Sequence, residues 1–474
     1  VYEVSAVTDT DADKLITWVP GVYETVDAPD PEMAIEGRRL LGEAARRDWG
    51  VAYSGQQSFS GSVGGFVLLD GTPLRFPIGS VQTGSFQTDG SAAYSSISGD
   101  PEGSNNKGDI YFSVDSGTNI AVNDILIFGV VNNQNADFTA TTTQEIRKVV
   151  SKSSNEIRVN YPFQFAHAAH DLKKVTSNSY YQHTIYGTTA LDTLTWQIKM
   201  LDSAETNAFT RRYYGGMVDS ATLSAEEGGL VTYGWDSVPF MGMVHNQYDY
   251  DGKTNDLSSA YPGGPSNTEL PGYAIMHSID NDNVGIPATS SGTVTHNFPS
   301  TEPYYFSQGE IKIHGITFAR VRSFSLSVSN GVEPRYYVKP AFGRNRGPNE
   351  MREQAREYGL SCTIASEDSA VGTSTSENAN ALFKELILEG DYGTPSSPSK
   401  KGLDVVLTFT RGTNDKIVVT IPDDGTAATG LNEQGAFITA ANHSIDGNNP
   451  IQSDVDMIFR NMKIDIYDSI PVYP

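Results

Sequence analysis

The residues that could carry chemistry are scattered through this sequence. Its eight histidines include one close pair, His167 and His170, whose spacing could place two imidazoles beside a metal ion. A zinc site needs three or four ligands, and neither a cysteine nor a carboxylate cluster accompanies this pair. We therefore interpret both histidines as structural, and the sequence predicts no metal site.

Acidic residues also fall short of a recognisable site. The stretches 249–256 and 280–282 faintly resemble calcium loops, but neither has the spacing or the terminal glutamate of an EF-hand. We interpret them as solvated acidic loops, with loose cation binding in strong salt as the alternative. Glu226 and Glu227 are adjacent, so on a strand their side chains point to opposite faces and do not share a substrate easily. A turn or a subunit rim is the better interpretation.

The remaining candidates have simpler structural explanations. Cys362 lies in an apolar stretch without an obvious histidine partner, which favours a buried packing role over a nucleophile. The glycine-rich stretch 60–65 lacks the residues of a phosphate-binding loop, and no helix directly follows it. We therefore expect that the protein is not an enzyme and has no catalytic residue, no cofactor-binding residue and no cofactor. Four tryptophans are interpreted as core or subunit-contact residues rather than a sugar-binding platform: Trp18, Trp49, Trp196 and Trp235.

Composition favours a β-rich fold. The chain has 474 residues, of which 38% are hydrophobic, with 24 Tyr, 20 Phe and 45 Gly. Aromatic residues that favour strands, together with glycine for turns, predict many short strands. No apolar run reaches the roughly 18 residues of a membrane span, and the acidic start of the chain does not have the pattern of a signal peptide. The single cysteine excludes an internal disulfide, which fits assembly in a reducing interior.

The charge is strongly unbalanced. Lys and Arg number 33 against 57 Asp and Glu, which gives a net charge of −24. This balance opposes tight binding to nucleic acid, because such binding requires basic patches that release counterions from phosphate. The excess of aspartate and the shortage of lysine are typical of proteins in molar salt, where the Debye length falls to about 3 Å. A halophilic origin and an ordinary acidic protein both remain open.

Alternating apolar and polar residues predict strands in the last third of the chain. This period-two pattern buries one face of a strand and leaves the other wet. The stretch 378–390 differs, because its apolar residues have helical spacing and Gly390 could end a helix there. We expect residues 301–474 to form one sheet sandwich or barrel with a short helix. The alternating stretches are 310–318, 323–328, 358–364, 403–409, 416–421 and 455–466.

The first part of the chain repeats this plan with an insertion. Ile16–Trp18 matches Ile316–Phe318, and the stretch that begins at Leu191 matches the one that begins at Leu403. The two spacings are 191 − 16 = 175 and 403 − 316 = 87 residues, so the first copy holds about 88 extra residues. We expect these to form a peripheral β-module. The expected boundaries are 1–80 with 180–250 for the first domain, 81–179 for the module, 251–300 for a linker and 301–474 for the second domain.

Several segments of structural rather than catalytic type occur in a fixed order. They include Phe306–Glu310, Val321–Asn330 and Glu333–Tyr337, together with Gly215–Val231, Phe409–Ile417 and Tyr467–Pro474. In number and order they resemble the major tail tube proteins of long-tailed (siphovirus-type) phages and archaeal tailed viruses. The resemblance covers most of residues 14–80 and 180–474, and the stretch 81–179 departs from the shortest family members.

The resemblance implies a mainly β fold class: two tandem phage-tail-tube β-sandwich or barrel domains, each with a short helix, plus the inserted β-module. It also implies stacked rings around a channel for genome delivery, with three two-domain chains in a homotrimeric, pseudo-hexameric ring. The implied place is the virion tail tube, assembled in the host cytoplasm without a membrane. Tape measure, tail terminator and baseplate proteins are implied partners, and viral DNA passes without tight binding. The alternatives are another tail component (distal tail, terminator or baseplate hub) and a secreted carbohydrate-active β-protein.

Overall fold

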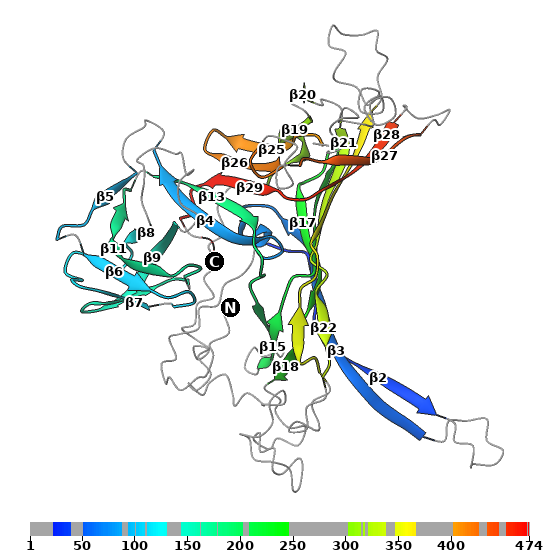
Figure 1. Ribbon diagram of the computed structural model, residues 1–474, viewed down its shortest axis with the longest axis horizontal. Coiled ribbons are helices and arrows are strands. Elements are labelled where there is room, and N and C mark those ends of the chain that lie inside the picture. Colours follow the sequence, from blue (N-terminus) through cyan, green and yellow to red (C-terminus); the bar gives the residue numbers. More distant parts are fainter. Residues whose placement is uncertain are drawn as a thin grey trace, which may run out of the picture.

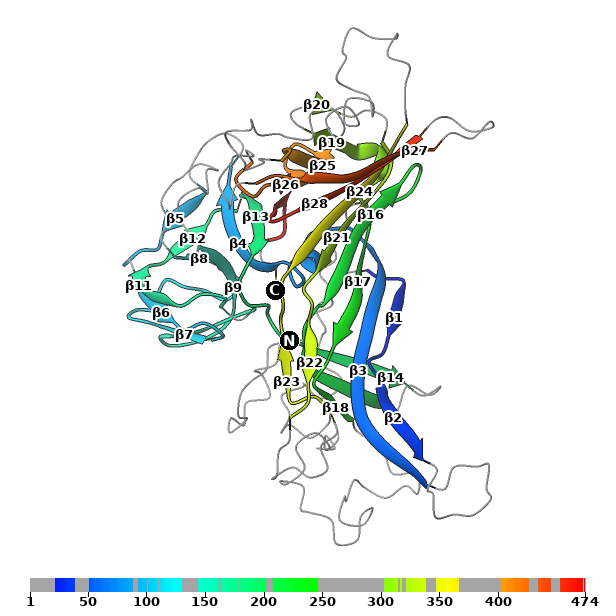
Figure 2. The ribbon, with the colours of Figure 1, turned by 45° about the vertical axis from the view of Figure 1, so that its right-hand side comes forward.

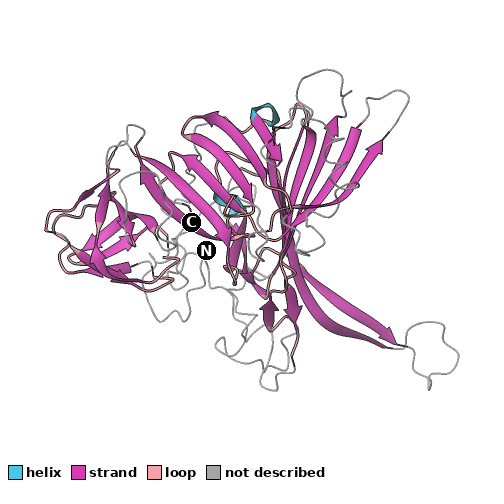
Figure 3. Ribbon diagram, turned by 45° about the horizontal axis from the view of Figure 1, so that its top comes forward, coloured by secondary structure: helices cyan, strands magenta, loops and turns pink. Residues whose placement is uncertain are grey.

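The chain folds almost entirely into antiparallel β-strands (Figure 1). Helical structure in the described part consists of two single turns, η2 (Thr72–Leu74) and η4 (Phe306–Gln308) (Figure 3). No helix in this part is long and apolar enough to cross a membrane. The expected mainly β fold class is confirmed. The computed structural model describes residues 22–38, 51–87, 93–99, 101–109, 111–129, 144–161, 163–177, 179–201, 208–245, 302–313, 316–317, 321–337, 347–365, 402–425, 434–444, 452–471 and 473.

The larger of two packed sheets, here called the long sheet, has nine strands. Its strand order is β1–β3–β17–β16–β21–β24–β28–β27, and β2 pairs with β3 to form a hairpin arm that projects from the body (Figures 1 and 2). The strands are β1 (Thr25–Asp27), β2 (Pro31–Arg38), β3 (Val51–Val67), β16 (Ser220–Glu226), β17 (Thr232–Pro239), β21 (Val321–Ser329), β24 (Glu357–Ala365), β27 (Phe437–Ser444) and β28 (Gln452–Phe459).

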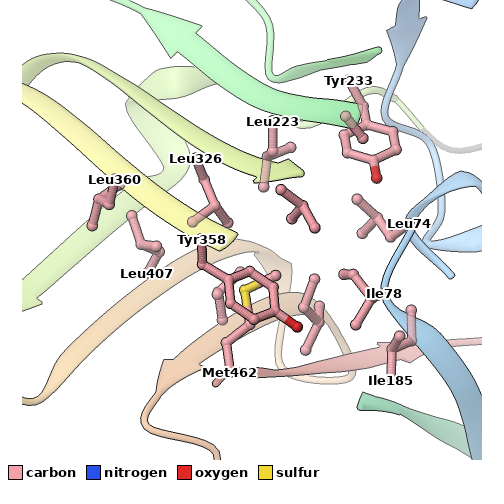
Figure 4. Packing of buried hydrophobic residues seen from close by; sticks show 14 of the residues in the cluster. Leu74, Ile78, Ile185, Leu223, Tyr233, Leu326, Tyr358, Leu360, Leu407 and Met462 are labelled. Atoms are coloured by element: carbon pink, nitrogen blue, oxygen red, sulfur yellow. The ribbon is translucent and has the colours of Figure 1, made fainter. Parts of the chain in front are cut away.

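The second sheet, here called the short sheet, has seven strands and packs against the long sheet. Its order is β20–β19–β25–β26–β29–β13–β4. One apolar core fills the space between the sheets, with Leu326 and Leu360 from the long sheet and Ile185 and Leu407 from the short sheet (Figure 4). The strands are β4 (Gly79–Phe86), β13 (Tyr180–Gly187), β19 (Gly309–Ile313), β20 (Ile316–Thr317), β25 (Val405–Gly412), β26 (Asp415–Ile421) and β29 (Lys463–Asp468).

The period-two pattern explains why these residues form a sandwich. In β21 the apolar residues Phe324, Leu326 and Val328 are buried, and Ser327 and Ser329 between and after them are exposed. Burying a leucine or phenylalanine side chain stabilises the fold by about 1.5–3 kcal/mol. The serines keep the strand soluble on its other face, so the strand belongs at the boundary between core and solvent.

Both sheets run without a break from the first half of the chain into the second. In the long sheet β16 pairs with β21 over seven residues, from Ser220 opposite Ser329 to Glu226 opposite Ser323. In the short sheet β13 pairs with β29 over six. The two halves therefore form one sandwich and share one core.

The strand order of the long sheet repeats. The unit β1–β3–β17–β16 is followed by β21–β24–β28–β27, in which each strand occupies the place of its counterpart. The expected match between the stretches at Leu191 and Leu403 is wrong, however. β14 (Leu194–Leu201) pairs with β15 (Ala208–Gly216), which pairs with β18 (Gly242–His245), in a separate three-stranded sheet, whereas β25 lies in the short sheet.

The extra residues of the first half form a separate β-module beside the short sheet (Figures 1 and 2). Its eight-stranded sheet surrounds a core of its own that contains Phe112, Phe128 and Phe163. The expected start at residue 81 falls inside β4, because Phe86 of β4 lies opposite Tyr180 of β13. The module strands are β5 (Tyr94–Ser96), β6 (Glu102–Asn105), β7 (Tyr111–Val114), β8 (Ile125–Phe128), β9 (Glu145–Ser153), β10 (Glu156–Val159), β11 (His167–Asp171) and β12 (Lys173–Val175).

The expected helices are met in part. In the first half the described part contains the single turn η2. The stretch 378–390, where the helix of the second domain is expected, and the linker 251–300 lie outside the described residues. A two-stranded ribbon of β22 (Glu333–Arg335) and β23 (Glu350–Arg352) completes the fold.

Truncation at the joint between the halves gives the first prediction. Leu326 is 2% exposed on β21, between β16 and β24, so Leu326→Ala leaves a cavity in the shared core. We expect a loss of about 2–5 kcal/mol in the free energy of unfolding, measured by chemical denaturation. The control Ser329→Ala on the exposed face of the same strand should change it by less than about 0.5 kcal/mol. Equal effects would show that the joint is not part of the core.

Candidate functional site

The exposed face of the long sheet is largely polar, although Ile458 of β28 is also exposed on it. The alternation that buries Phe324 and Leu326 on one side places serine, threonine and aspartate on the other. This face crosses the joint between β16 and β21, so both halves of the chain contribute to it. Hydroxyls and carboxylates are the main polar groups on this face.

Hydrogen bonds between hydroxyls and carboxylates organise this face. Ser361 Oγ donates to Asp456 Oδ1 at 2.7 Å, and Thr363 Oγ1 donates to Asp454 Oδ1 at 2.9 Å. Both pairs lie directly opposite each other on β24 and β28. Cross-strand pairs of this kind stabilise a sheet modestly. They hold the carboxylates in place without cancelling their negative charge.

A similar bond occurs in the first four-strand unit. Thr222 Oγ1 of β16 donates to Asp236 Oδ2 of β17 at 2.6 Å. Asp236 follows Trp235, whose side chain is buried and whose indole donates to the carbonyl of Pro73. The buried tryptophan thereby fixes the strand on the core side, while the carboxylate beside it faces the polar side.

Carboxylates outnumber cations on the strands of this face. Among the described residues of the eight strands on the path of the long sheet, the one lysine or arginine is Arg322, and its Nε lies 3.0 Å from Glu227 Oε2. Such a surface repels phosphate groups at low salt. The acidic residues in these strands are Asp27, Glu226, Asp236, Glu357, Asp454 and Asp456.

The path of the long sheet ends at two strands, β1 and β27, that each pair on one side only among the described strands. The edge at β1 is apolar as well as unpaired: Val22, Tyr23 and Val26 are 40%, 43% and 38% exposed. Unpaired strand edges readily pair with another chain. These two edges are therefore open to pairing with another chain, as is the short-sheet edge at β20, which pairs only with β19 among the described strands.

Comparison with known proteins places this architecture in a family. The family model described as phage tail tube protein matches residues 44–458. The chain belongs to the phage tail tube protein family. Among solved structures, a chain from the virion of a native gene transfer agent (GTA) particle is similar at 10% identity, with a TM-score of 0.21, over 32% of this chain and 92% of that chain. Among curated proteins no match was found.

Family membership fixes the function in outline. The protein is a structural subunit of a phage-type tail tube and hence a virion component, as the sequence predicted. The exposed face and the two edges of the long sheet are therefore interpreted as parts of a self-assembling wall.

His167 lies in a buried ion cluster of the module. Its Nε2 is 2.7 Å from Glu145 Oε1, and Arg147 donates to Glu145 Oε2 at 2.5 Å. The same carboxylate accepts the backbone N–H groups of Gln164 and Phe165 at 3.1 and 3.2 Å. This cluster explains His167 as a structural residue. Among the residues that the structure describes, no group of three or more potential ligands could hold a metal ion.

The other candidates also have structural surroundings. Cys362 is 1% exposed in the core, and Glu227 makes the ion pair with Arg322 where β16 turns toward β17. Gly65 has a φ of +66°, which suits glycine, at a bulge in β3. The strand β11 includes His170, whose side chain is outside the described part, as are Trp18, Trp49 and the stretches 249–256 and 280–282.

Sequence reasoning missed the hydroxyl–aspartate pairs. A signal was present, because aspartates alternate with Val455 and Met457 in β28 and serines alternate with apolar residues in β21. Alternation identifies the wet face of each strand but not which strand is its neighbour. The pairs depend on the register of β24 against β28.

Acidification should weaken the module through Glu145. Burial by itself raises the pKa of Glu145, but the Arg147 charge and the hydrogen bond from His167 together lower this pKa below its ordinary value of 4.5. A lowered pKa in the folded state gives stability that is present above pH 4.5 and lost as the pH falls through the folded pKa. The pH dependence of thermal unfolding checks this.

The variant Glu145→Gln should remove that pH dependence. It also leaves the buried cation of Arg147 without its carboxylate partner, at a cost of about 3–5 kcal/mol. The exposed control Glu156→Gln on β10 should leave the stability close to that of the parent. A Glu145→Gln protein that is as stable as the parent at pH 7 would show that the ion cluster does not hold the module together.

The thiol of Cys362 should not react in the folded protein. Burial raises its pKa to about 12, with a further contribution from the Asp456 charge. The thiolate is the reactive species, so at pH 8 a thiol reagent should label the protein only after denaturant is added. Rapid stoichiometric labelling of the native protein would contradict the burial of this side chain.

Proposed function

We propose that three copies of this chain join their long sheets edge to edge into a closed ring, and that rings stack into the tube through which viral DNA passes. The observation that carries this proposal is the repeat within the long sheet. The sheet contains one four-strand unit twice, and its two ends are unlike edges. Unlike edges can close a ring, and a ring whose two sides differ can stack head to tail.

The joint inside the chain serves as the template for the joint between chains. β1 corresponds to β21, since each is the first strand of its unit and pairs with a long central strand. β27 corresponds to β16, since each is the last. Because β16 pairs with β21 within the chain, β27 of one copy should pair with β1 of the next.

The register of this joint follows from the repeat. The match of Ile16–Trp18 with Ile316–Phe318 makes Thr25 the counterpart of Ser325, because 25 + 300 = 325. Counting through paired positions across the two units then makes Asn442 the counterpart of Ser224. Ser224 lies opposite Ser325 within the chain, so Thr25 of one copy should lie opposite Asn442 of its neighbour.

Three copies are enough to supply six four-strand units to the wall. Eight strands on the path of each long sheet make 3 × 8 = 24 strands, arranged as six four-strand units. Closure pairs both end strands of this path, β1 and β27, and so removes two edges that otherwise invite uncontrolled pairing. A ring of six chains would contain twelve units and would widen the channel accordingly.

The polar face of the long sheet suits the channel side of that wall. The short sheet covers its apolar face, so the face with the Ser361–Asp456 and Thr363–Asp454 pairs is the one left for the lumen. A face on which carboxylates outnumber cations gives the phosphates of passing DNA little to bind, because tight binding requires basic patches. The net charge of −24 agrees with passage without tight binding.

The type of virus, the place of assembly and the partners are assigned from the sequence. We place the protein in the tail of a long-tailed phage or archaeal virus, assembled in the host cytoplasm, with tape measure, terminator and baseplate proteins as partners and without enzymatic activity. The resemblance of the segments Val321–Asn330 and Tyr467–Pro474 supports this placement. The acidic, aspartate-rich composition supports a host in concentrated salt.

Engineered disulfides test the proposed joint. The double variant Thr25→Cys with Asn442→Cys should form disulfides between copies on mild oxidation, because both residues belong to exposed positions that the repeat places opposite each other. Non-reducing gels should show dimers and trimers and end at the trimer, since a third bond closes the ring. A ladder that continues to six chains would overturn the trimer.

Two control pairs make the result specific. Ser224→Cys with Ser325→Cys bridges the joint inside the chain, where the residues are direct partners, and should cross-link without increasing the mass. Asp27→Cys with Asn442→Cys shifts one partner by two residues and should cross-link poorly. If the internal pair closes and Thr25 does not bond to Asn442, the edge-to-edge joint is wrong. Cys362 stays buried and does not interfere.

A further inference from the structure

The last strand of the short sheet is buried, although it lies at an edge. β4 ends the path of that sheet and pairs on one side with β13. All its residues except Ser80 are nonetheless buried, including the polar residues Gln82, Thr83 and Ser85. An ordinary edge strand leaves its outward N–H and C=O groups in water. Something else in the chain therefore covers this edge.

The cover is the inserted module, which lies beside β4 in Figures 1 and 2. The backbone N–H of Val81 donates to Gln164 Oε1 at 3.0 Å, and the backbone N–H of Thr83 donates to the carbonyl of Gln144 at 3.3 Å. Val81 and Thr83 are two residues apart, so their N–H groups point to the same side of the strand, away from β13. The module thus accepts hydrogen bonds from two backbone N–H groups that point outward from this edge strand.

Both capping residues are adjacent to Glu145, Gln144 through the chain and Gln164 through a hydrogen bond to its buried carboxylate. Gln144 directly precedes Glu145 in the chain, and the N–H of Gln164 donates to Glu145 Oε2 at 3.1 Å. Glu145 is anchored in turn by Arg147 and His167. The ion cluster therefore sets the position of the two groups that reach β4.

An apolar contact adds to the polar ones. Tyr181 of β13 packs in one buried cluster with Ile127 and Ile146 of the module. The module does not extend the short sheet, because β9 begins at Glu145 and pairs with β8 and β10 instead. It ends the sheet with one main-chain carbonyl and one side-chain amide, which give no template for a further strand.

We infer that the inserted module is an edge cap, which keeps β4 from pairing with a second copy of this chain. A β4 edge without the cap would expose outward donors at Val81 and Thr83 to the same edge of another copy, and antiparallel edges of this kind self-associate. The cap leaves the edges of the long sheet as the place where copies join. That copies join at the edges of the long sheet rests on the proposed ring, whereas the capping of β4 does not.

The first test removes one capping group. Gln164→Ala deletes the acceptor for the Val81 N–H, so hydrogen exchange in peptides that cover 79–86 should become at least tenfold faster, measured by mass spectrometry on the full chain. The matched control is Gln87→Ala, because the Gln87 side chain donates to Thr176 Oγ1 at 2.6 Å, a bond to the module side that does not touch the edge. Unchanged exchange in Gln164→Ala, or an equal increase in both variants, would overturn the cap.

The second test removes the module. Residues 87–179 are replaced by Asn-Gly, which joins the direct partners Phe86 and Tyr180 by a two-residue hairpin turn. We expect additional association, seen by light scattering, in which the 79–86 amides exchange at least tenfold more slowly in the associated species than in the diluted monomer. No additional association, or association that leaves these amides unprotected, would overturn the proposal.

The disulfide pair Thr25→Cys with Asn442→Cys separates this proposal from the ring. In the chain without the module, this pair should still cross-link, because neither residue lies near β4 in the sheet order. Loss of the cross-link with protected β4 amides would show that copies do not join at the edges of the long sheet, and it would leave the cap standing. A retained cross-link with unprotected amides would overturn the cap and leave the joint between long sheets standing.

Discussion

The pairing of β16 with β21 is the interaction on which the rest of this architecture depends. Seven residues on each strand join two stretches of chain that are about a hundred residues apart in sequence. Because the joint is made of backbone hydrogen bonds within one sheet, the two halves cannot rotate against each other as separate domains would. The repeated four-strand units therefore act as one wall segment.

Buried polar groups reinforce this joint. Asn330, directly after β21, donates from Nδ2 to the carbonyls of Pro77 and Val218 at 2.9 Å each, and its Oδ1 accepts from Arg356 Nε at 2.7 Å. At the other sheet, the ring of Tyr473 stacks on His183 at 3.8 Å between centroids, and its hydroxyl accepts the Gly71 N–H. Both contacts tie residues of the second half to the first. Satisfied buried networks of this kind favour one arrangement over alternatives.

Much of the fold could be predicted from the sequence because alternation is a local signal. The stretches at 323–328, 358–364 and 455–466 contain β21, β24, β28 and β29 in part or in full. The expected insertion of about 88 residues rests on the Leu191 match; the structure has a separate β-module in this part of the chain, but it does not have that match. The Leu191 match failed because a short apolar pattern reports strand propensity, whereas sheet membership is decided by long-range partners.

The same distinction limits what could be predicted of the site. The expectation that the chain has no catalytic constellation rests on residue types and spacing, which can be read from the sequence. The wet residues of each strand also follow from alternation. Which carboxylate meets which hydroxyl, and which edges stay unpaired, depends on the register and order of the strands, and no local pattern encodes these.

The edges at β1 of the long sheet and β4 of the short sheet differ in exposure. The long sheet leaves Val22, Tyr23 and Val26 exposed at β1, whereas the short sheet buries β4 under the module. If chains join as in the proposed ring, an open β4 edge would offer a neighbour a second way to pair, which does not close that ring. Capping one sheet removes the competitor without altering the backbone of the other. An insertion between β4 and β13 can do this because its two ends leave and re-enter at Phe86 and Tyr180, beside the edge that it covers.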